Sequence, residues 1–356
     1  MAFSETIFFT GFPGFIGERL VERLARPDTQ FYLLVQKAFV ESASVAVEAI
    51  ADRTGTPLEN FALIEGDVTL PNLGIHHEDL PTIRDEVTSV FHLAAAYDLA
   101  VSKDIAFAVN LQGTKNVNDF CLSLPNLRRY NYVSTCYVAG RRNGRVLENE
   151  LAHDAGFRNF YEETKYLAEA EVEKLKADIP VTIYRPSVVV GDSKTGETVK
   201  YDGIYYLIQY LRRAPGLLRF INVGNRDVRL NLVPVDFVVD AIATLSTDEA
   251  AVGKTLAIAD PEPLTTAGLF DVIAEKLSRK GSMIVPPPAL VEWWLMTPVS
   301  PPLTGLPHHG VPYFFLAQTY DTSQAKELLD AHGVTCPRFR EYAGNLIDFV
   351  AKHPQL

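Results

Sequence analysis

A glycine-spaced segment near the start of the sequence constrains the fold more than any other feature. Residues Thr10–Gly17 read T-G-F-P-G-F-I-G, between a strand-like run at Thr6–Thr10 and a helical pattern at Phe15–Leu24. At a strand-to-helix turn, three such glycines provide a tight bend, a close approach of backbone to phosphate, and close packing of helix on strand. The free N–H groups of the first helical turn favour an anion. The segment therefore predicts a dinucleotide-binding βαβ unit.

Apolar runs and helix-period segments alternate through the first half of the chain. Further strands are expected at Phe31–Val35, Phe61–Glu65, Ser89–Leu93, Tyr130–Ser134 and Val181–Tyr184. Further helices are expected at Val40–Arg53, Ile105–Leu122 and Tyr161–Ala177. Nearly continuous apolar strands are typical of sheets covered on both faces, and the alternation with helices indicates a doubly wound parallel sheet.

The pattern changes after Pro186. The expected elements are a loop at Gly191–Gly203, a helix at Ile204–Arg213, an extended segment at Asn231–Val235, a helix at Val238–Leu245, a strand at Lys254–Ala259, a proline-rich apolar loop at Val285–Pro312 and helical patterning over Gln318–Val350. We predict an α/β fold with a Rossmann-type domain at 1–190, to which a segment near 231–260 returns. A smaller C-terminal α/β substrate lobe is expected within 191–356.

Composition disfavours several classes of protein and site. The formal net charge is −11 over 356 residues, whereas nucleic-acid binding needs a basic surface, so no nucleic-acid partner is expected. The three cysteines, Cys121, Cys136 and Cys336, are far apart in the sequence, so neither a disulfide framework nor a metal site is predicted. The N-terminus is not signal-like and the sequence has no long apolar run, so the chain is predicted to be cytoplasmic, with no membrane contact predicted. It is expected to be a monomer or a homodimer.

The end of the second strand bears on which dinucleotide binds. An acidic residue there would accept a hydrogen bond from a ribose 2′-hydroxyl, whereas a cation would favour a 2′-phosphate. Phe31–Val35 is followed by Gln36 and Lys37, so NADP(H) is predicted rather than NAD(H). Asp67, after the third strand, is a candidate for binding the adenine amine, with a turn-forming Asp as the alternative.

A phenol, an ammonium and a hydroxyl form the predicted catalytic group. Tyr161 and Lys165 lie four residues apart in Y-E-E-T-K, which places both on one face of a helix. A cation beside the phenol would favour the phenolate, so Tyr161 could exchange a proton with a substrate oxygen. Thr135 follows the predicted strand Tyr130–Ser134 and could hydrogen-bond that oxygen. Ser134 is the alternative hydroxyl.

Together these motifs resemble the extended short-chain dehydrogenase/reductase family. The resemblance rests on T-G-F-P-G-F-I-G, F-H-L-A-A-A at Phe91–Ala96, N-L-Q-G-T at Asn110–Thr114, V-S-T-C-Y-V at Val133–Val138, Y-E-E-T-K and Y-R-P-S at Tyr184–Ser187, in the family's order. It implies that Thr135, Tyr161 and Lys165 are catalytic. The expected cofactor-binding residues are Gly11, Phe12, Pro13, Gly14, Phe15, Ile16, Gly17, Gln36, Lys37, Asp67, Val68, Ala94, Ala95, Lys165, Pro186, Ser187 and Val188.

Further motifs resemble the fatty acyl reductase and thioester reductase branch of that family. They are L-L-V-Q at Leu33–Gln36, A-A-A-Y-D-L at Ala94–Leu99, G-D-S-K-T-G-E-T at Gly191–Thr198, Y-D-G-I-Y-Y at Tyr201–Tyr206 and N-L-V-P-V-D-F-V-V-D-A at Asn231–Ala241. The branch often has Arg where Gln36 stands. The resemblance implies NADPH-dependent reduction of an acyl-CoA or carrier-bound acyl thioester to an aldehyde, and sometimes onward to an alcohol.

The substrate-binding residues are expected near the active-site end of the sheet. They are Ala96, Tyr97, Cys136, Tyr201 and Tyr205. The apolar segment Val285–Pro312 either lines an acyl channel or contacts a membrane, or else forms a packed lobe over the cleft. Two alternative functions stay open: a nucleotide-sugar epimerase, dehydratase or hydroxysteroid-type dehydrogenase, and a non-enzymatic NADP-binding regulator.

Overall fold

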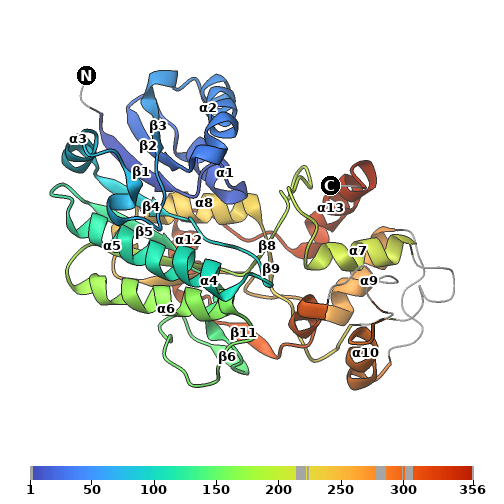
Figure 1. The fold of residues 1–356 in the computed structure, drawn as a ribbon. Helices are drawn as coiled ribbons and strands as arrows, with labels where there is room; N and C mark the ends of the chain where they lie inside the picture. Colours follow the sequence, from blue (N-terminus) through green and yellow to red (C-terminus); the bar gives the residue numbers. More distant parts are fainter. Residues whose placement is uncertain are drawn as a thin grey trace.

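A seven-stranded parallel sheet forms the centre of the protein. The computed structural model describes residues 3–213, 222, 224–277, 286–298, 300 and 308–354. Within these, the sheet order is β10-β7-β5-β4-β1-β2-β3, with every neighbouring pair parallel. The strands are β1 Glu5–Thr10, β2 Thr29–Val35, β3 Phe61–Glu65, β4 Ser89–His92, β5 Arg129–Val133, β7 Val181–Pro186 and β10 Thr255–Ile258. The order reverses between β1 and β4, so the predicted doubly wound sheet is confirmed (Figure 1).

Alternate side chains of each central strand enter opposite cores. In β1, Ile7 and Phe9 pack into one apolar cluster and Phe8 into the other, because successive strand residues point to opposite faces. One face is covered by α1 Phe15–Leu24, α2 Val40–Thr54, α8 Val235–Ser246 and α12 Ser323–Ala331. The other is covered by α3 Leu80–Glu86, α5 Gly113–Leu122 and α6 Phe160–Lys174. Burial on both faces explains the continuous apolar runs Ile7–Phe9 in β1 and Phe31–Val35 in β2.

The C-terminal half builds a second lobe with its own core. After β7, strand β8 Val188–Val190 pairs in parallel with β9 Leu232–Pro234. Three helices, α7 Ile204–Arg213, α9 Thr266–Lys276 and α13 Phe339–Lys352, contribute Ile208, Phe270 and Leu346 to this core. Figure 1 shows the three helices grouped beside the sheet.

Two segments of the C-terminal half pack with the main sheet. The segment near 231–260 returns as α8 and β10. Helix α12 also joins the first core, through Ala325 and Leu329. The two lobes therefore interleave along the chain.

Two local predictions in the C-terminal half differ from the structure. The segment Val285–Pro312 was expected to be a loop, yet α10 Pro288–Leu295 lies within it. A helix tolerates proline in its first turn, so the prolines mark the start of this helix. Positions 285, 299 and 301–307 lie outside the described residues.

The second difference concerns Gln318–Val350, where helical patterning was expected throughout. This segment begins with strand β11 Gln318–Tyr320, which pairs in parallel with β6 Gly144–Val146. Three-residue strands are too short to show a sequence period.

Asn231 joins the two lobes at the end of the sheet. Its side-chain oxygen accepts from the Asp260 N–H at 2.9 Å and from the Ser187 hydroxyl at 2.7 Å. Its amide donates to the Asp260 carbonyl at 2.8 Å. Asn231 itself is 6% exposed.

We predict that Asn231→Ala lowers the free energy of unfolding by about 2–3 kcal/mol, because buried partners lose their hydrogen bonds. Urea denaturation measures this, with the exposed Asn143→Ala as control, expected within about 0.5 kcal/mol of the parent.

Candidate active site

The glycine turn brings two backbone segments into direct contact. Gly11 has φ +94°, and a Cβ on it would lie 2.8 Å from the Ala94 nitrogen. A Cβ on Gly17 would lie 2.5 Å from the Gly11 carbonyl oxygen. Gly14 is the N-cap of α1 and contributes no side-chain cap. Positions 11, 14 and 17 thus have room only for glycine. The first N–H groups of α1 are left to a ligand.

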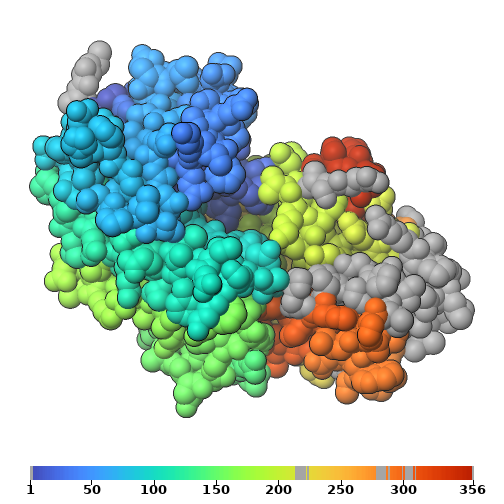
Figure 2. Space-filling view, in the orientation of Figure 1, coloured from blue at the N-terminus to red at the C-terminus, as the bar shows by residue number. Residues whose placement is uncertain are grey.

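A cavity of about 730 Å³ runs from this turn to the ends of β5 and β7. That volume lies in the usual range of ligand sites. In Figure 2, the blue N-terminal surface and the yellow-green surface near residue 200 face each other across a hollow on this side. Of the residues predicted to bind the cofactor, the following line the cavity: Gly11, Phe12, Pro13, Gly14, Phe15, Ile16, Gly17, Gln36, Asp67, Val68, Ala94, Ala95, Lys165, Pro186, Ser187 and Val188. Lys37 is not among the lining residues.

The far end of the cavity lies at the ends of β2 and β3. The Gln36 amide donates to the Asp67 carboxylate at 2.9 Å, and the Thr69 N–H donates to the same carboxylate at 2.8 Å. Asp67 is therefore held in the cavity wall and also shapes its own turn. Lys37 is exposed on a short 3₁₀ turn one residue beyond Gln36, and the cavity wall there includes the Ser42 residue.

Helix α6 carries the predicted phenol and ammonium against the end of β5. Asn159 caps the helix by accepting from the Glu162 N–H at 2.9 Å. Tyr161 and Lys165, one turn apart, are 5% and 3% exposed and both line the cavity. The Lys165 ammonium donates to the Tyr132 hydroxyl and to the Val133 carbonyl, both at 2.9 Å.

The predicted hydroxyl lies on the same wall. Thr135 lines the cavity and accepts from the Tyr137 N–H at 3.2 Å, at the start of the 3₁₀ turn Cys136–Ala139. Ser134, the alternative, also lines the cavity, but its hydroxyl donates to the Glu169 carboxylate. The structure therefore brings Thr135, Tyr161 and Lys165 together at one end of one cavity.

Burial controls the protonation of this group. It raises the pKa of Tyr161 well above its ordinary value, against the opposing effect of a hydrogen bond with Thr135. Burial also lowers the pKa of Lys165 to about 7, opposed by the negative charge of Glu169. We expected a cation to lower the phenol pKa. Instead, the ammonium binds Tyr132 and Val133, and loss of water around the phenol dominates.

Asn110 and His92 form polar contacts that hold the cavity wall in place, and both lie in motifs singled out from the sequence. Asn110, in a π-helical turn at Phe107–Gln112, accepts from the Ala96 N–H at 2.7 Å and donates to the Thr164 hydroxyl at 3.0 Å. It thereby ties the loop after β4 to α6. His92 contacts the Thr10 and Thr114 hydroxyls at 2.7 and 3.0 Å. Burial lowers its pKa to about 3, so it is neutral and packs at the strand end.

The residues predicted to bind substrate separate into two groups. Tyr97 lines the cavity, with its ring edge-on to Tyr161 at 5.4 Å between centroids. The following residues lie outside the lining. Ala96 is held by Asn110, and Cys136 packs behind the wall and donates to the Arg185 carbonyl. Tyr201 and Tyr205 pack against each other in the second core, with tilted rings. Tyr137 does line the cavity, and its ring packs on that of Tyr313 with 4.8 Å between centroids. It was not predicted from the sequence as a substrate-binding residue.

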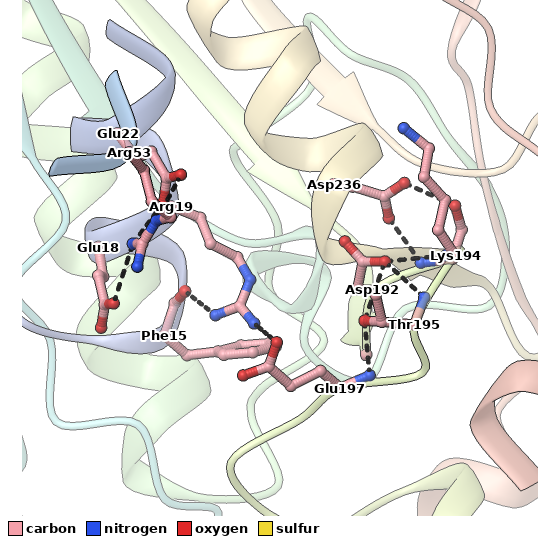
Figure 3. Close-up of polar contacts among 12 residues, drawn as sticks. Phe15, Glu18, Arg19, Glu22, Arg53, Asp192, Lys194, Thr195, Glu197 and Asp236 are labelled. Atoms are coloured by element: carbon pink, nitrogen blue, oxygen red, sulfur yellow. Dashed lines mark hydrogen bonds and ion pairs between the residues drawn. The ribbon is translucent and has the colours of Figure 1, made fainter. Parts of the chain in front are cut away.

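The loop after β8 crosses to α1 beside the cavity (Figure 3). Arg19 reaches from α1 to Glu197 at 3.2 Å, and its guanidinium lies over the Phe15 ring at 4.4 Å. Ser193 donates twice to Asp236 of α8, at 2.8 and 2.6 Å, which anchors the base of the loop. Thr198, Val199, Lys200 and Asp202 then line the cavity. Thr198 and Asp202 belong to motifs that carry the family resemblance, but that resemblance did not assign them to the cavity, because only the fold brings this loop to α1.

The described ranges contain no group of three or more His, Cys, Asp or Glu side chains arranged to hold a metal ion. None of their helices has both the length and the apolar character that a bilayer span requires. The two neighbouring histidines at 308 and 309 are predicted from the sequence to be solvent-exposed, but His308 is half-buried and contacts the Thr297 carbonyl at 3.0 Å. The side chain of His309 lies outside the described residues.

The glycine turn lies at the switch point of a doubly wound sheet, with Tyr161 and Lys165 one helical turn apart in the same cavity. These features define the class of NAD(P)-dependent oxidoreductases with the extended short-chain dehydrogenase/reductase fold. Within this class the chain belongs to the male sterility protein family, whose NAD-binding model matches residues 9–242.

The chain is also similar to individual proteins. A fatty acyl-CoA reductase of Drosophila melanogaster, wat, is 27% identical over 281 residues, covering 68% of this chain and 54% of its own length. The chain thus spans about half of that relative. The non-canonical nonribosomal peptide synthetase FrzA of a Cladobotryum species is 27% identical over 81% of this chain and 29% of its own length. The terminal R domain of the myxalamid PKS-NRPS pathway has the same fold, with a TM-score of 0.82 and 22% identity over 100% of this chain and 92% of that one.

The crowding at Gly11 yields a prediction. Gly11→Ala should weaken the binding of a reduced nicotinamide dinucleotide at least about tenfold, or ~1.4 kcal/mol, because its Cβ would force the turn away from Ala94. Fluorescence titration with NADH and with NADPH measures this. The control is Gly144→Ala, which also has positive φ, at +83°, but meets no atom within 4 Å. It should cost about 1 kcal/mol of stability and leave binding unchanged. Equal binding by both variants would contradict the assigned turn.

Proposed function

We propose that the chain is an NADPH-dependent reductase of a fatty acyl thioester, carried on CoA or an acyl-carrier protein, or of a fatty aldehyde. The observation that carries the proposal is that Thr135, Tyr161 and Lys165 line one end of the cavity whose wall also includes the glycine turn. The name of the fatty acyl-CoA reductase relative supports the acyl thioester class, since an acyl-CoA is a thioester.

The residues present fit a dinucleotide. The glycine turn and the N-terminus of α1 would hold its phosphates. Lys165 would hold the nicotinamide ribose from the opposite end of the cavity. When bound, the reduced nicotinamide supplies a hydride to the substrate carbonyl carbon. The side chains of Tyr161 and Lys165 are almost fully buried in the cavity wall, which limits the bulk water around the reacting atoms.

Tyr161 is suited to act as the general acid. Because its pKa is raised, the phenol carries its proton at neutral pH and can donate it to the substrate oxygen. Thr135, hydrogen-bonded to the phenol, would bind the same oxygen and stabilise its developing negative charge. For a thioester, the protonated adduct then loses a thiol by breaking the C–S bond, which leaves an aldehyde.

The central test is the removal of the phenol oxygen. Tyr161→Phe should lower kcat by at least ~100-fold, since proton donation is lost, with little change in NADPH affinity. NADPH oxidation is followed by absorbance with acyl-CoAs, carrier-bound acyl groups, fatty aldehydes and nucleotide sugars. The matched control is Tyr166→Phe, on the same helix, where the ring packs on His153 and Phe157 away from the cavity. Turnover confined to nucleotide sugars, or full activity in Tyr161→Phe, would contradict the proposal.

The preference for NADPH has a separate test. The wall at the end of β2 presents the Gln36 amide, with Lys37 next to it on an exposed turn. A long lysine stem can reach a 2′-phosphate from there. Lys37→Ala should weaken NADPH binding by about tenfold, the scale of one hydrogen bond to a charged group, and leave NADH binding unchanged. Binding of both cofactors by isothermal calorimetry measures the ratio. An unchanged ratio would remove Lys37 from cofactor selection.

A further inference from the structure

A buried ion pair lies directly behind the proposed catalytic wall. Glu169 of α6 and Arg185 of β7 are 0% and 4% exposed, and the Arg185 Nε and Nη2 atoms donate to one Glu169 oxygen at 2.9 and 2.5 Å. The other Glu169 oxygen accepts from the Ser134 hydroxyl. Arg185 also donates to the Glu148 and Glu150 carbonyls. A buried ion pair often adds little net stability, because the cost of desolvating both charges offsets their attraction. Its presence here therefore points to a role besides stability.

The position of Glu169 connects it to all three proposed catalytic residues. It follows Lys165 by four residues and Tyr161 by eight, so the three share one face of α6. Its partner Ser134 directly precedes Thr135 at the end of β5. Glu169 does not line the cavity, so it can act only through these neighbours.

The surroundings of Lys165 leave Glu169 as the counter-charge in the described part of the chain. The groups that face Lys165 are Tyr132 from β5, His92 from β4, and Tyr161 and Glu169 from α6. Burial keeps Tyr132 and Tyr161 as neutral phenols and His92 as a neutral imidazole. The groups that face Glu169 are Ser134, Tyr132, Arg185 and Cys136. Glu173 in turn faces Arg185.

We propose that Glu169 is a positioning residue: through Ser134 it fixes the end of β5 that carries Thr135, and its negative charge favours the ammonium form of Lys165. This inference rests on the proposed function only in what it assigns to Thr135. The effect on Lys165 belongs to cofactor binding. Since the pKa of Lys165 is about 7 and Glu169 raises it, removing this charge would leave Lys165 neutral at a lower pH.

The charge effect is tested without any substrate. NADH is the probe, because its pyrophosphate keeps a constant charge across the range, and its dissociation constant is measured from pH 5 to 10 by fluorescence. Binding should weaken as Lys165 loses its proton. In Glu169→Gln the midpoint should move down by about one pH unit, the scale on which a neighbouring opposite charge acts. An unchanged midpoint in a folded Glu169→Gln protein would overturn the proposal.

Three variants separate this role from a structural one. Glu148→Gln is the matched control, since Glu148 is 1% exposed but accepts from the backbone N–H groups of residues 257, 324 and 325. It should lose stability without moving the midpoint. Glu169→Gln leaves Arg185 unpaired, so Glu169→Gln/Arg185→Gln is prepared beside it. The double variant should also shift the midpoint down, but by less, because loss of the Arg185 cation partly offsets loss of the Glu169 anion. A shift of equal size in Glu148→Gln would overturn the specific role of Glu169.

The geometric effect has its own readout. Ser134→Ala removes the link to β5 without changing any charge, so the NADH midpoint should stay at the parent value. If the parent turns over an acyl thioester, kcat in Ser134→Ala should fall about tenfold at unchanged NADPH affinity. An unchanged kcat would overturn the positioning of Thr135. A parent protein without turnover would instead refute the proposed function, and the NADH midpoints would still decide the charge effect.

Discussion

The site depends on the register of three parallel strands, β1, β4 and β5. Thr10 pairs with His92, which places Gly11 directly against the Leu93–Ala94 backbone. His92 pairs in turn with Tyr132, whose hydroxyl accepts a hydrogen bond from the Lys165 ammonium. Because parallel strands end at one edge, this register sets the phosphate turn, the cavity wall and the α6 side chains at fixed separations. A slip by one residue would turn every one of these side chains to the other face.

Burial governs the chemistry of that edge. A phenol and an ammonium one helical turn apart would suggest a depressed phenol pKa in water-exposed surroundings. Here both groups are enclosed, so burial keeps Tyr161 protonated and brings the pKa of Lys165 to about 7. The pKa values in a buried site of this kind depend on nearby charges, and the Glu169–Arg185 ion pair lies directly behind the cavity wall.

The second lobe completes the cavity instead of standing apart from it. Asn231 ties Ser187 at the cavity to Asp260 of the returning segment. The loop of Figure 3 is anchored to α8 through Asp236 and meets α1 through the Arg19–Glu197 pair. Both connections span long stretches of sequence, so the shape of the cavity reflects the packing of two lobes that share segments of chain.

Local sequence was sufficient for the elements whose signals are local. The glycine turn, the alternating strands and helices, and the spacing of Tyr161 and Lys165 could all be predicted, because backbone geometry and burial impose short periods on nearby residues. The side-chain directions of Cys136, Tyr201 and Tyr205, the pairing of β6 with β11, and the protonation of Tyr161 could not. Each of these depends on residues far away in the chain, whose contacts and exclusion of water exist only after the chain has folded.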